Sequence, residues 1–199
     1  YSVVLWNPED FQEKYRLLGH NAPVVAATFS PDGRFLATGG DDFLALVWDM
    51  TAIRRGAEPV PIAKFVHQGK ITDLTISPNS SMLATSSWDG ILRVWSLETM
   101  RPRAELRGHI GPVQAAQFIE NGARIISAGR DGHVRLWDLS EARYVRSLIK
   151  NGWGINVMHV DEDLRFIAFG GAQGAMKIIS LDDTDISVTL ADGKDPVLA

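Results

Sequence analysis

Residue types that build hydrolytic triads, namely histidine, serine or threonine, and aspartate, recur together in this chain at one fixed spacing. Asp follows His by 22 positions, the hydroxyl residue lies four positions before Asp, and Trp follows Asp by six. A triad requires one exposed nucleophile beside an oxyanion site, so three identical sets that each end in Trp indicate scaffolding rather than catalysis. The sets are His20, Thr38, Asp42 and Trp48; His67, Thr85, Asp89 and Trp95; and His109, Ser127, Asp131 and Trp137.

Signals for other chemistry are weak or missing. The sequence has no Gly-x-Ser-x-Gly motif, and no two histidines lie at positions i and i+4, as a helical metal site would require. The glycine-rich segment 170–174 lacks the Lys-Ser/Thr ending of a phosphate-binding loop. No cysteine is present, which excludes disulfides, zinc ribbons and thiol chemistry. We expect no catalytic residue, no metal and no cofactor.

The distances between successive aspartates of the sets, 47 and then 42 residues, mark an internal repeat. A further step of 42 reaches Gln173, in a fourth segment that keeps the hydrophobic pattern but loses the polar set. There Asn151, Phe169, Gln173 and Ile179 stand in the places of His, Ser/Thr, Asp and Trp. This repeat must therefore be held by apolar packing and by its neighbours.

Each repeat consists of four short apolar segments separated by turn residues, as expected for a four-stranded antiparallel sheet. In the second repeat the pattern predicts strands at 71–77, 82–87 and 91–97, and an outer strand at 103–107. Turn signals such as Ser30-Pro31-Asp32-Gly33 and Asp131-Gly132 supply the backbone angles that tight hairpins need. No stretch has a sustained helical period, so the fold class is all-β with little helix.

The pairs Gly19-His20 and Trp48-Asp49, repeated as Gly108-His109 and Trp137-Asp138, resemble the boundary dipeptides of the WD-repeat family. The resemblance covers almost the whole chain and implies a β-propeller in which His, Ser/Thr, Asp and Trp form a hydrogen-bonded structural tetrad in each blade. We expect residues 1–199 to form a partial propeller of four full blades, with partial blades at both ends. The expected repeats span about 13–50, 61–98, 101–139 and 144–181, and the partial blades 1–18 and 192–199.

Four full and two partial blades are fewer than the seven that are usual in this family. The resemblance therefore favours an excerpt of a larger propeller, or one part of a split one. Open sheet edges carry unpaired backbone groups that can pair with other chains.

In the family, partner proteins contact the loop before the first strand and the turn that carries the tetrad Asp. By register these positions are Pro23, Val25 and Asp41; Lys70, Thr72 and Trp88; Pro112, Gln114 and Arg130; and Gly154, Asn156 and Ala172. Two of the six Trp, at 88 and 153, lie outside the repeated structural position, and Trp and Arg are enriched in interface hot spots. The expected partner-binding residues are Asp41, Lys70, Thr72, Trp88, Gln114, Arg130, Trp153 and Asn156.

These features predict a non-catalytic interaction scaffold or recruiting subunit of a larger assembly, which binds partner proteins or peptides on one face. An alternative is a reader of a modified, for example phosphorylated, peptide through Lys70, Trp88 and Arg130. A less favoured one is part of an enzyme whose catalytic domain lies outside this chain. The mild net charge of −4 and the lack of a long apolar run argue against nucleic acid and membrane insertion, and the composition is typical of an intracellular, cytoplasmic or nuclear, protein.

Overall fold

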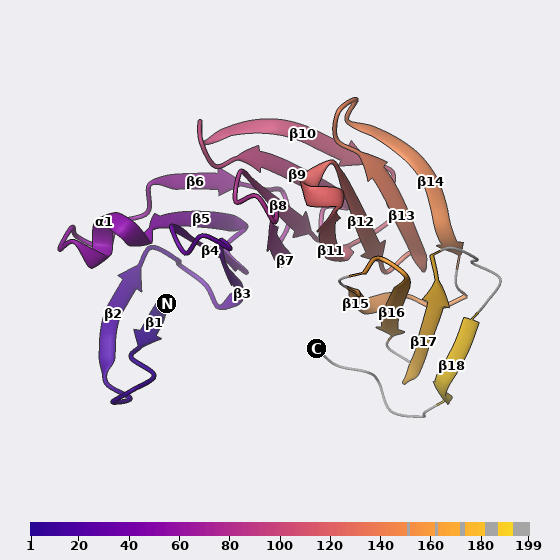
Figure 1. The fold of residues 1–199 in the computed structure, drawn as a ribbon, viewed down its shortest axis with the longest axis horizontal. Helices are drawn as coiled ribbons and strands as arrows, with labels where there is room; N and C mark the ends of the chain where they lie inside the picture. Colours follow the sequence, from indigo (N-terminus) through magenta and orange to yellow (C-terminus); the bar gives the residue numbers. More distant parts are fainter. Residues whose placement is uncertain (151, 162, 172–173, 182–186, 193–199) are drawn as a thin grey trace.

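The computed structural model describes residues 1–150, 152–161, 163–171, 174–181 and 187–192. Within these residues, eighteen strands form one two-stranded and four four-stranded sheets, all antiparallel (Figure 1). The two-stranded sheet contains β1 (Ser2–Trp6) and β2 (Glu13–Leu18). The first and second complete sheets contain β3 (Val24–Phe29), β4 (Phe35–Gly40), β5 (Leu44–Asp49) and β6 (Ala63–Val66), and β7 (Ile71–Ile76), β8 (Met82–Ser87), β9 (Ile91–Ser96) and β10 (Arg101–Arg107). The third and fourth contain β11 (Val113–Ile119), β12 (Arg124–Gly129), β13 (His133–Asp138) and β14 (Arg143–Lys150), and β15 (Ile155–Val160), β16 (Phe166–Gly171), β17 (Ala175–Ser180) and β18 (Ser187–Asp192).

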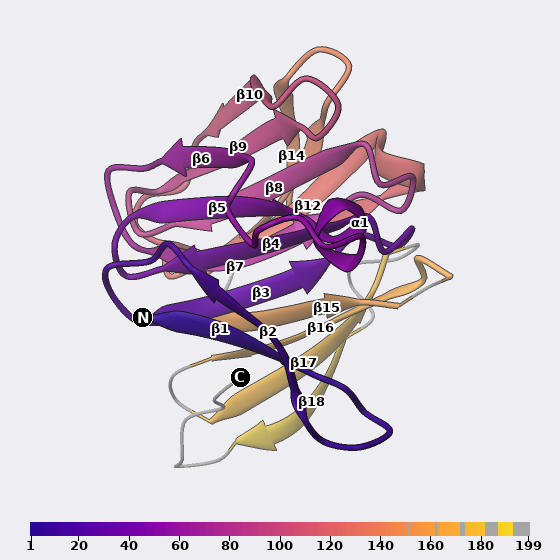
Figure 2. The ribbon, with the colours of Figure 1, turned by 90° about the vertical axis from the view of Figure 1, so that its left-hand side faces the viewer.

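The sheets stand side by side in an arc. In Figure 1 the strands β3, β7, β11 and β15 lie on the inside of the arc, and β6, β10, β14 and β18 lie on the outside. The view in Figure 2, from the side, shows the sheets stacked face against face. The arc is not closed between the β1–β2 sheet and the fourth complete sheet. The predicted all-β class of four-stranded antiparallel blades is confirmed, while the partial blade expected at 192–199 lies almost entirely outside the described residues.

Sequence repeat and sheet are offset by one strand. The outer strand β2 pairs with β1, although it belongs to the same sequence repeat as β3. In the same way β6 closes the first complete sheet and begins the second repeat. Each repeat is therefore shared between two neighbouring sheets, which ties them covalently.

The hydrophobic core lies between adjacent sheets rather than within any one of them. Between the first two, Val47 and Phe65 pack with Leu74, Leu83 and Trp95, and the rings of Phe65 and Trp95 stack at a centroid distance of 4.1 Å. The middle strands are buried along their whole length, as in β4 and β8, whereas outer strands such as β10 expose most side chains. Burial on both faces explains why β4 and β8 consist of apolar and small uncharged residues instead of alternating apolar and charged ones.

The long connection after β5 contains a short helix, α1 (Met50–Arg54), that the sequence pattern does not predict. The Asp49 carboxylate caps it by accepting the Thr51 and Ala52 N–H groups, each at 2.9 Å. Met50 and Ile53 are buried in the apolar cluster between the β1–β2 sheet and the first complete sheet. Within the described residues, no helix is both long enough and apolar enough to span a bilayer.

Candidate functional site: four sheet locks and the face above them

The first complete sheet contains the expected tetrad as a continuous chain of hydrogen bonds. The Trp48 indole N–H donates to Thr38 Oγ1 at 3.0 Å, and Thr38 Oγ1 lies 2.9 Å from His20 Nε2. His20 Nδ1 lies 3.0 and 3.1 Å from the two Asp42 oxygens. Since a carboxylate only accepts, the imidazole proton belongs on Nδ1, and the threonine hydroxyl donates to Nε2. Every polar group of the set is thereby satisfied, and the hydroxyl is fully buried rather than placed as a nucleophile.

The third sheet repeats this chain and extends it with a buried arginine. His109 lies between Ser127 Oγ at 2.8 Å and Asp131 Oδ1 at 2.9 Å, and the Trp137 N–H donates to Ser127 Oγ at 2.8 Å. Arg135 Nη1 donates to the other Asp131 oxygen at 2.8 Å. Burial raises the pKa of the Asp131 carboxyl, but hydrogen bonds from His109 and from the backbone N–H groups of Ile110 and His133 outweigh it and lower this pKa far below its usual range.

The second sheet has an incomplete tetrad. His67 Nε2 contacts Thr85 Oγ1 at 2.7 Å and the Trp95 N–H donates to the same oxygen, but buried His67 Nδ1 has no hydrogen-bond partner. Asp89 instead accepts from Arg93 Nη1 at 2.8 Å. Burial, followed by the Arg93 charge, lowers the pKa of His67 to about 4. The pKa of Asp89 is also lowered, because hydrogen bonds from Arg93 and from backbone N–H groups outweigh its burial.

A single Cβ atom accounts for this difference. The first and third sheets have glycine two positions before the tetrad Asp, and a Cβ at Gly40 would lie 2.8 Å from Asp42 Oδ1 and 2.9 Å from His20 Nδ1. A Cβ at Gly129 would lie 2.7 Å from His109 Nδ1. The second sheet has Ser87 at this position. By analogy with Gly40 and Gly129, a Cβ at this position would crowd the place in which histidine and aspartate meet, and we attribute the missing contact in the second sheet to it.

Replacing Ser87 with glycine is expected to let His67 Nδ1 reach Asp89, as in the neighbouring sheets. An adjacent carboxylate favours the imidazolium, so the pKa of His67 should rise from about 4 by at least one unit. A pH titration of the His67 ring signals by NMR measures this shift, with the His109 signals as an internal control. An unchanged His67 titration would contradict the role assigned to the serine Cβ.

In the fourth sheet, packing of an aromatic side chain takes the place of the hydrogen-bonded tetrad. A Cβ at Gly171, the counterpart of Gly40 and Gly129, would lie 2.2 Å from Trp153 Cε3, so the indole occupies the place that the imidazole takes elsewhere. The ring also packs on Phe169 at a centroid distance of 5.9 Å. This arrangement agrees with the apolar packing expected for the degenerate repeat. Asn151 and Gln173 themselves lie outside the described residues.

Sequence reasoning did not find the two buried arginines. Arg93 and Arg135 each follow the tetrad Asp by four positions, where the first sheet has Leu46. Both point along the third strand of their sheet toward the Asp at its start, forming ion pairs at 2.8 Å. The repeat spacing that reveals the tetrads also contains this signal, because the two arginines fall in one register.

One repeated backbone contact joins three pairs of the positions that the family register marks for partner binding. The residue before each tetrad Asp donates its N–H to the carbonyl of the loop before the inner strand. The pairs are Asp41 to Pro23, Trp88 to Lys70, and Arg130 to Pro112, at 2.8, 2.9 and 2.9 Å. We name the surface formed by these loops and turns the loop face.

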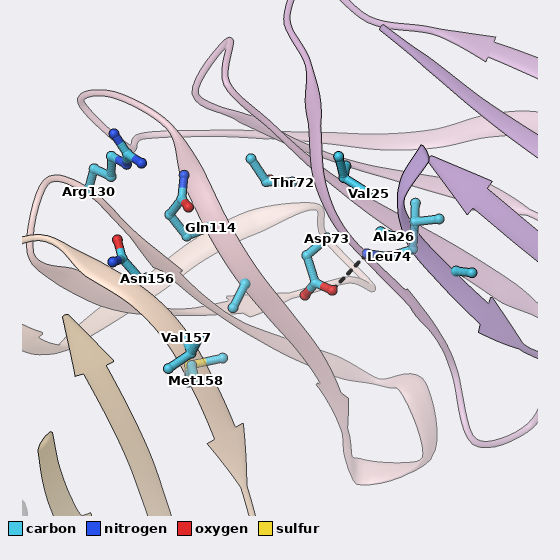
Figure 3. Close-up of a pocket in the computed structure, with 12 residues that line it drawn as sticks. Val25, Ala26, Thr72, Asp73, Leu74, Gln114, Arg130, Asn156, Val157 and Met158 are labelled. Carbon is cyan, nitrogen blue, oxygen red and sulfur yellow. Dashed lines mark hydrogen bonds between the residues drawn. The ribbon is translucent and has the colours of Figure 1, made fainter. Parts of the chain in front are cut away.

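Contacts on the loop face join neighbouring sheets. The Arg130 guanidinium lies 4.9 Å from the centre of the Trp88 ring, whose side chain is 47% exposed. Lys70 Nζ pairs with Asp41 of the preceding sheet at 2.5 Å. Thr72, Gln114 and Asn156 line a hollow on the inner side of the arc (Figure 3). Trp153 is only partly exposed and packs against the fourth sheet, and Ala172 lies outside the described residues.

Comparisons with known proteins agree with this architecture. A family profile described as "WD domain, G-beta repeat" matches residues 11–49, 59–96 and 100–138. The chain is 28% identical over 186 residues to "Protein tipD" of Dictyostelium discoideum, covering 87% of this chain and 29% of that protein. It is 28% identical over 181 residues to "Pre-mRNA-splicing factor cwf17" of Schizosaccharomyces pombe, covering 90% and 52%. "Telomerase protein component 1" of Rattus norvegicus is 36% identical over 124 residues, covering 61% and 4%.

The chain thus spans about half, or less, of the length of these relatives. The matched segments make up more than half of the chain, and each one contains a complete set of the four tetrad residues. Their ends follow the offset between repeat and sheet, since each segment includes the outer strand of the preceding sheet. On this sequence and structural evidence, the chain belongs to the WD-repeat family.

Proposed function

We propose that this chain is a non-catalytic interaction platform that binds a partner protein or peptide on its loop face. The WD-repeat family is generally non-catalytic, and the hydroxyl group of each tetrad in this chain is buried and hydrogen-bonded to histidine and tryptophan. Relatives whose names denote a splicing factor and a small ribosomal subunit protein favour membership of a larger assembly. The same names favour a cytoplasmic or nuclear location.

The observation that carries this proposal is the pairing of Trp88 with Arg130 across two sheets. Trp88 leaves about half of its surface open to solvent, a considerable exposed apolar area for one side chain. The guanidinium over one ring face holds the indole in place, so little side-chain entropy remains to be lost on binding. A fixed aromatic side chain next to a cation is the composition of an interface hot spot.

Charges on the loop face favour an unmodified partner over a phosphorylated one. Lys70 forms an ion pair with Asp41, which reduces the positive charge that it could offer to a phosphate group. The Arg130 guanidinium is engaged by the Trp88 ring. A phosphopeptide reader needs several free cations converging on one point, so recognition of a phosphorylated peptide is the second choice.

Replacing Trp88 with alanine is expected to weaken partner binding at least tenfold, because hot-spot truncations cost roughly 2 kcal/mol or more. Affinity purification with the unaltered chain, Trp88→Ala and Arg130→Ala, followed by quantitative mass spectrometry, measures the loss. Both variants should lose the same partner. The melting temperature should change little, because Trp88 lies on a turn outside the core clusters.

Trp6→Ala is the matched control, since Trp6 is 60% exposed and lies on β1, in the two-stranded sheet at one end of the arc. It should keep the partner that the Trp88 variant loses. Equal capture by all variants would exclude the loop face around Trp88 as the docking surface. A fall in melting temperature that parallels the loss of binding would instead assign Trp88 a packing role.

A further inference from the structure

The inner strands of the four complete sheets line an open hollow of about 600 Å³ on the inner side of the arc. Its walls are formed by residues 25–27, 72–74, 114–115 and 156–158, together with Arg130. Asp73 and Arg130 are the charged side chains among these lining residues. Figure 3 shows Arg130, Gln114 and Asn156 together on one side of the hollow and the Asp73 carboxylate apart from them. The one carboxylate of the hollow, that of Asp73, therefore lies apart from its one guanidinium, that of Arg130.

Asp73 has hydrogen bonds but no counter-ion. One oxygen accepts the N–H of Leu74 at 2.8 Å, and the other accepts the N–H of Ala116, from the neighbouring sheet, at 3.0 Å. No ion pair to Asp73 occurs within the described part of the chain. Burial raises the pKa of the Asp73 carboxyl to about 6, an effect that the two backbone hydrogen bonds only partly offset. A carboxylate in such surroundings gains more than an exposed one from an incoming positive charge.

The fold itself does not require a carboxylate at this place. The inner strands have Ala26, Ala115 and Val157 at the positions that correspond to Asp73 in the first, third and fourth sheets. Those sheets pack in the same arc with small or apolar side chains there. An aspartate in one inner strand is therefore an addition to the repeat pattern, and it carries a desolvation cost that the other three avoid.

We propose that the hollow receives an arginine side chain of the partner and that Asp73 pairs with its guanidinium; this inference rests on the proposed function of the loop face. Each Asp73 oxygen accepts one N–H and keeps a second lone pair. A guanidinium presents two parallel N–H groups that match two carboxylate oxygens.

The test uses the unaltered chain, labelled with ¹⁵N, and the probe acetyl-Gly-Arg-Gly-amide. The N–H groups of Leu74 and Ala116 donate to the Asp73 carboxylate, so their NMR signals report directly on any ligand there. We expect both signals to shift and to saturate as the probe is added. The matched control probe has citrulline in place of arginine and keeps the shape without the charge. It should bind roughly tenfold or more weakly, because hydrogen bonds to charged groups are the stronger ones.

Asp73→Asn should abolish the preference for arginine over citrulline, and because the two probes are compared on the unaltered chain, the test does not depend on that variant folding. Equal shifts with both probes, or shifts confined to the Trp88 indole signal, would overturn the proposal. Loss of the partner by Trp88→Ala together with an unresponsive Asp73 would leave the proposed function in place and remove only this inference. Retention of the partner by Trp88→Ala would contradict the proposed docking surface around Trp88, whatever the Leu74 and Ala116 signals show.

Discussion

Replacing Asp131 with alanine is expected to lower the free energy of unfolding by about 3–5 kcal/mol, as for other buried ion pairs that lose one partner. Asp131 is the counter-ion of the buried Arg135 and also accepts hydrogen bonds from His109 and from the backbone N–H groups of Ile110 and His133. The alanine variant leaves the guanidinium buried without an anion. Urea denaturation followed by fluorescence measures the change.

The first sheet provides the matched control, because its tetrad lacks the arginine. Asp42→Ala removes the same type of contacts to His20 and the backbone, but Leu46 stands where the third sheet has Arg135. We expect a smaller loss of about 1–3 kcal/mol, the cost of buried donors left without partners. Arg135→Leu in the Asp131→Ala background should recover part of the lost stability. Equal losses for Asp42→Ala and Asp131→Ala, with no recovery, would contradict the role assigned to the buried arginine.

Acidification from pH 7 to pH 4 is expected to cost about 3 kcal/mol through His67 alone, at 1.36 kcal/mol for each unit of pKa difference. Burial holds the folded-state pKa at about 4, whereas the reference value is 6.5. Between these values the unfolded chain binds a proton that the folded chain does not. The contribution is therefore fully present above pH 6.5 and is lost as the pH falls to 4.

Asp73 changes the stability with the opposite sign over part of this pH range. Its folded-state pKa of about 6 exceeds the reference value of 3.8, so its contribution to stability is present below pH 3.8 and is lost as the pH rises through 6. The free energy of unfolding of the unaltered chain therefore depends on pH through His67 and Asp73 together. His109, whose pKa is lowered by burial, contributes as well. The His67 contribution must be taken from a difference between two variants.

The difference in unfolding free energy between the unaltered chain and His67→Gln, measured at several pH values, isolates the histidine. The unaltered chain should lose stability more steeply than the variant between pH 6.5 and 4. Ser87→Gly offers a second comparison, because a raised His67 pKa should flatten the same part of the curve. Parallel pH profiles for all three proteins would exclude His67 as the origin of the acid sensitivity.

Much of the fold could be predicted from sequence because each tetrad lies within one sheet and its flanking loops. Antiparallel pairing sets Thr38 against Leu46 and Leu36 against Trp48, so the spacing of these residues follows from strand and turn lengths. The same local logic placed the strands 82–87 and 91–97, which the structure shows as Met82–Ser87 and Ile91–Ser96. The loop face was likewise predicted by register, although its role in binding stays a prediction.

Helix α1 could not be predicted, because its stability comes from packing rather than from local pattern. Five residues are too few to show a helical period, and an isolated helix of that length is not stable in water. It forms where Asp49 caps its first turn and where Met50 and Ile53 meet the apolar surface beneath the first sheet.

The sequence by itself determined the repeat, the all-β class and the identity of the structural tetrads, because strand pairing and tight turns depend on residues close together in the chain. Tertiary structure alone decided that Ser87 breaks one tetrad, that Trp153 fills the place of a histidine, and that Arg130 covers Trp88. Those outcomes depend on whether a Cβ atom at one position would come closer than 3 Å to its neighbours, or on how one sheet stacks against the next. Close packing makes such contacts decisive, and no local sequence pattern encodes them.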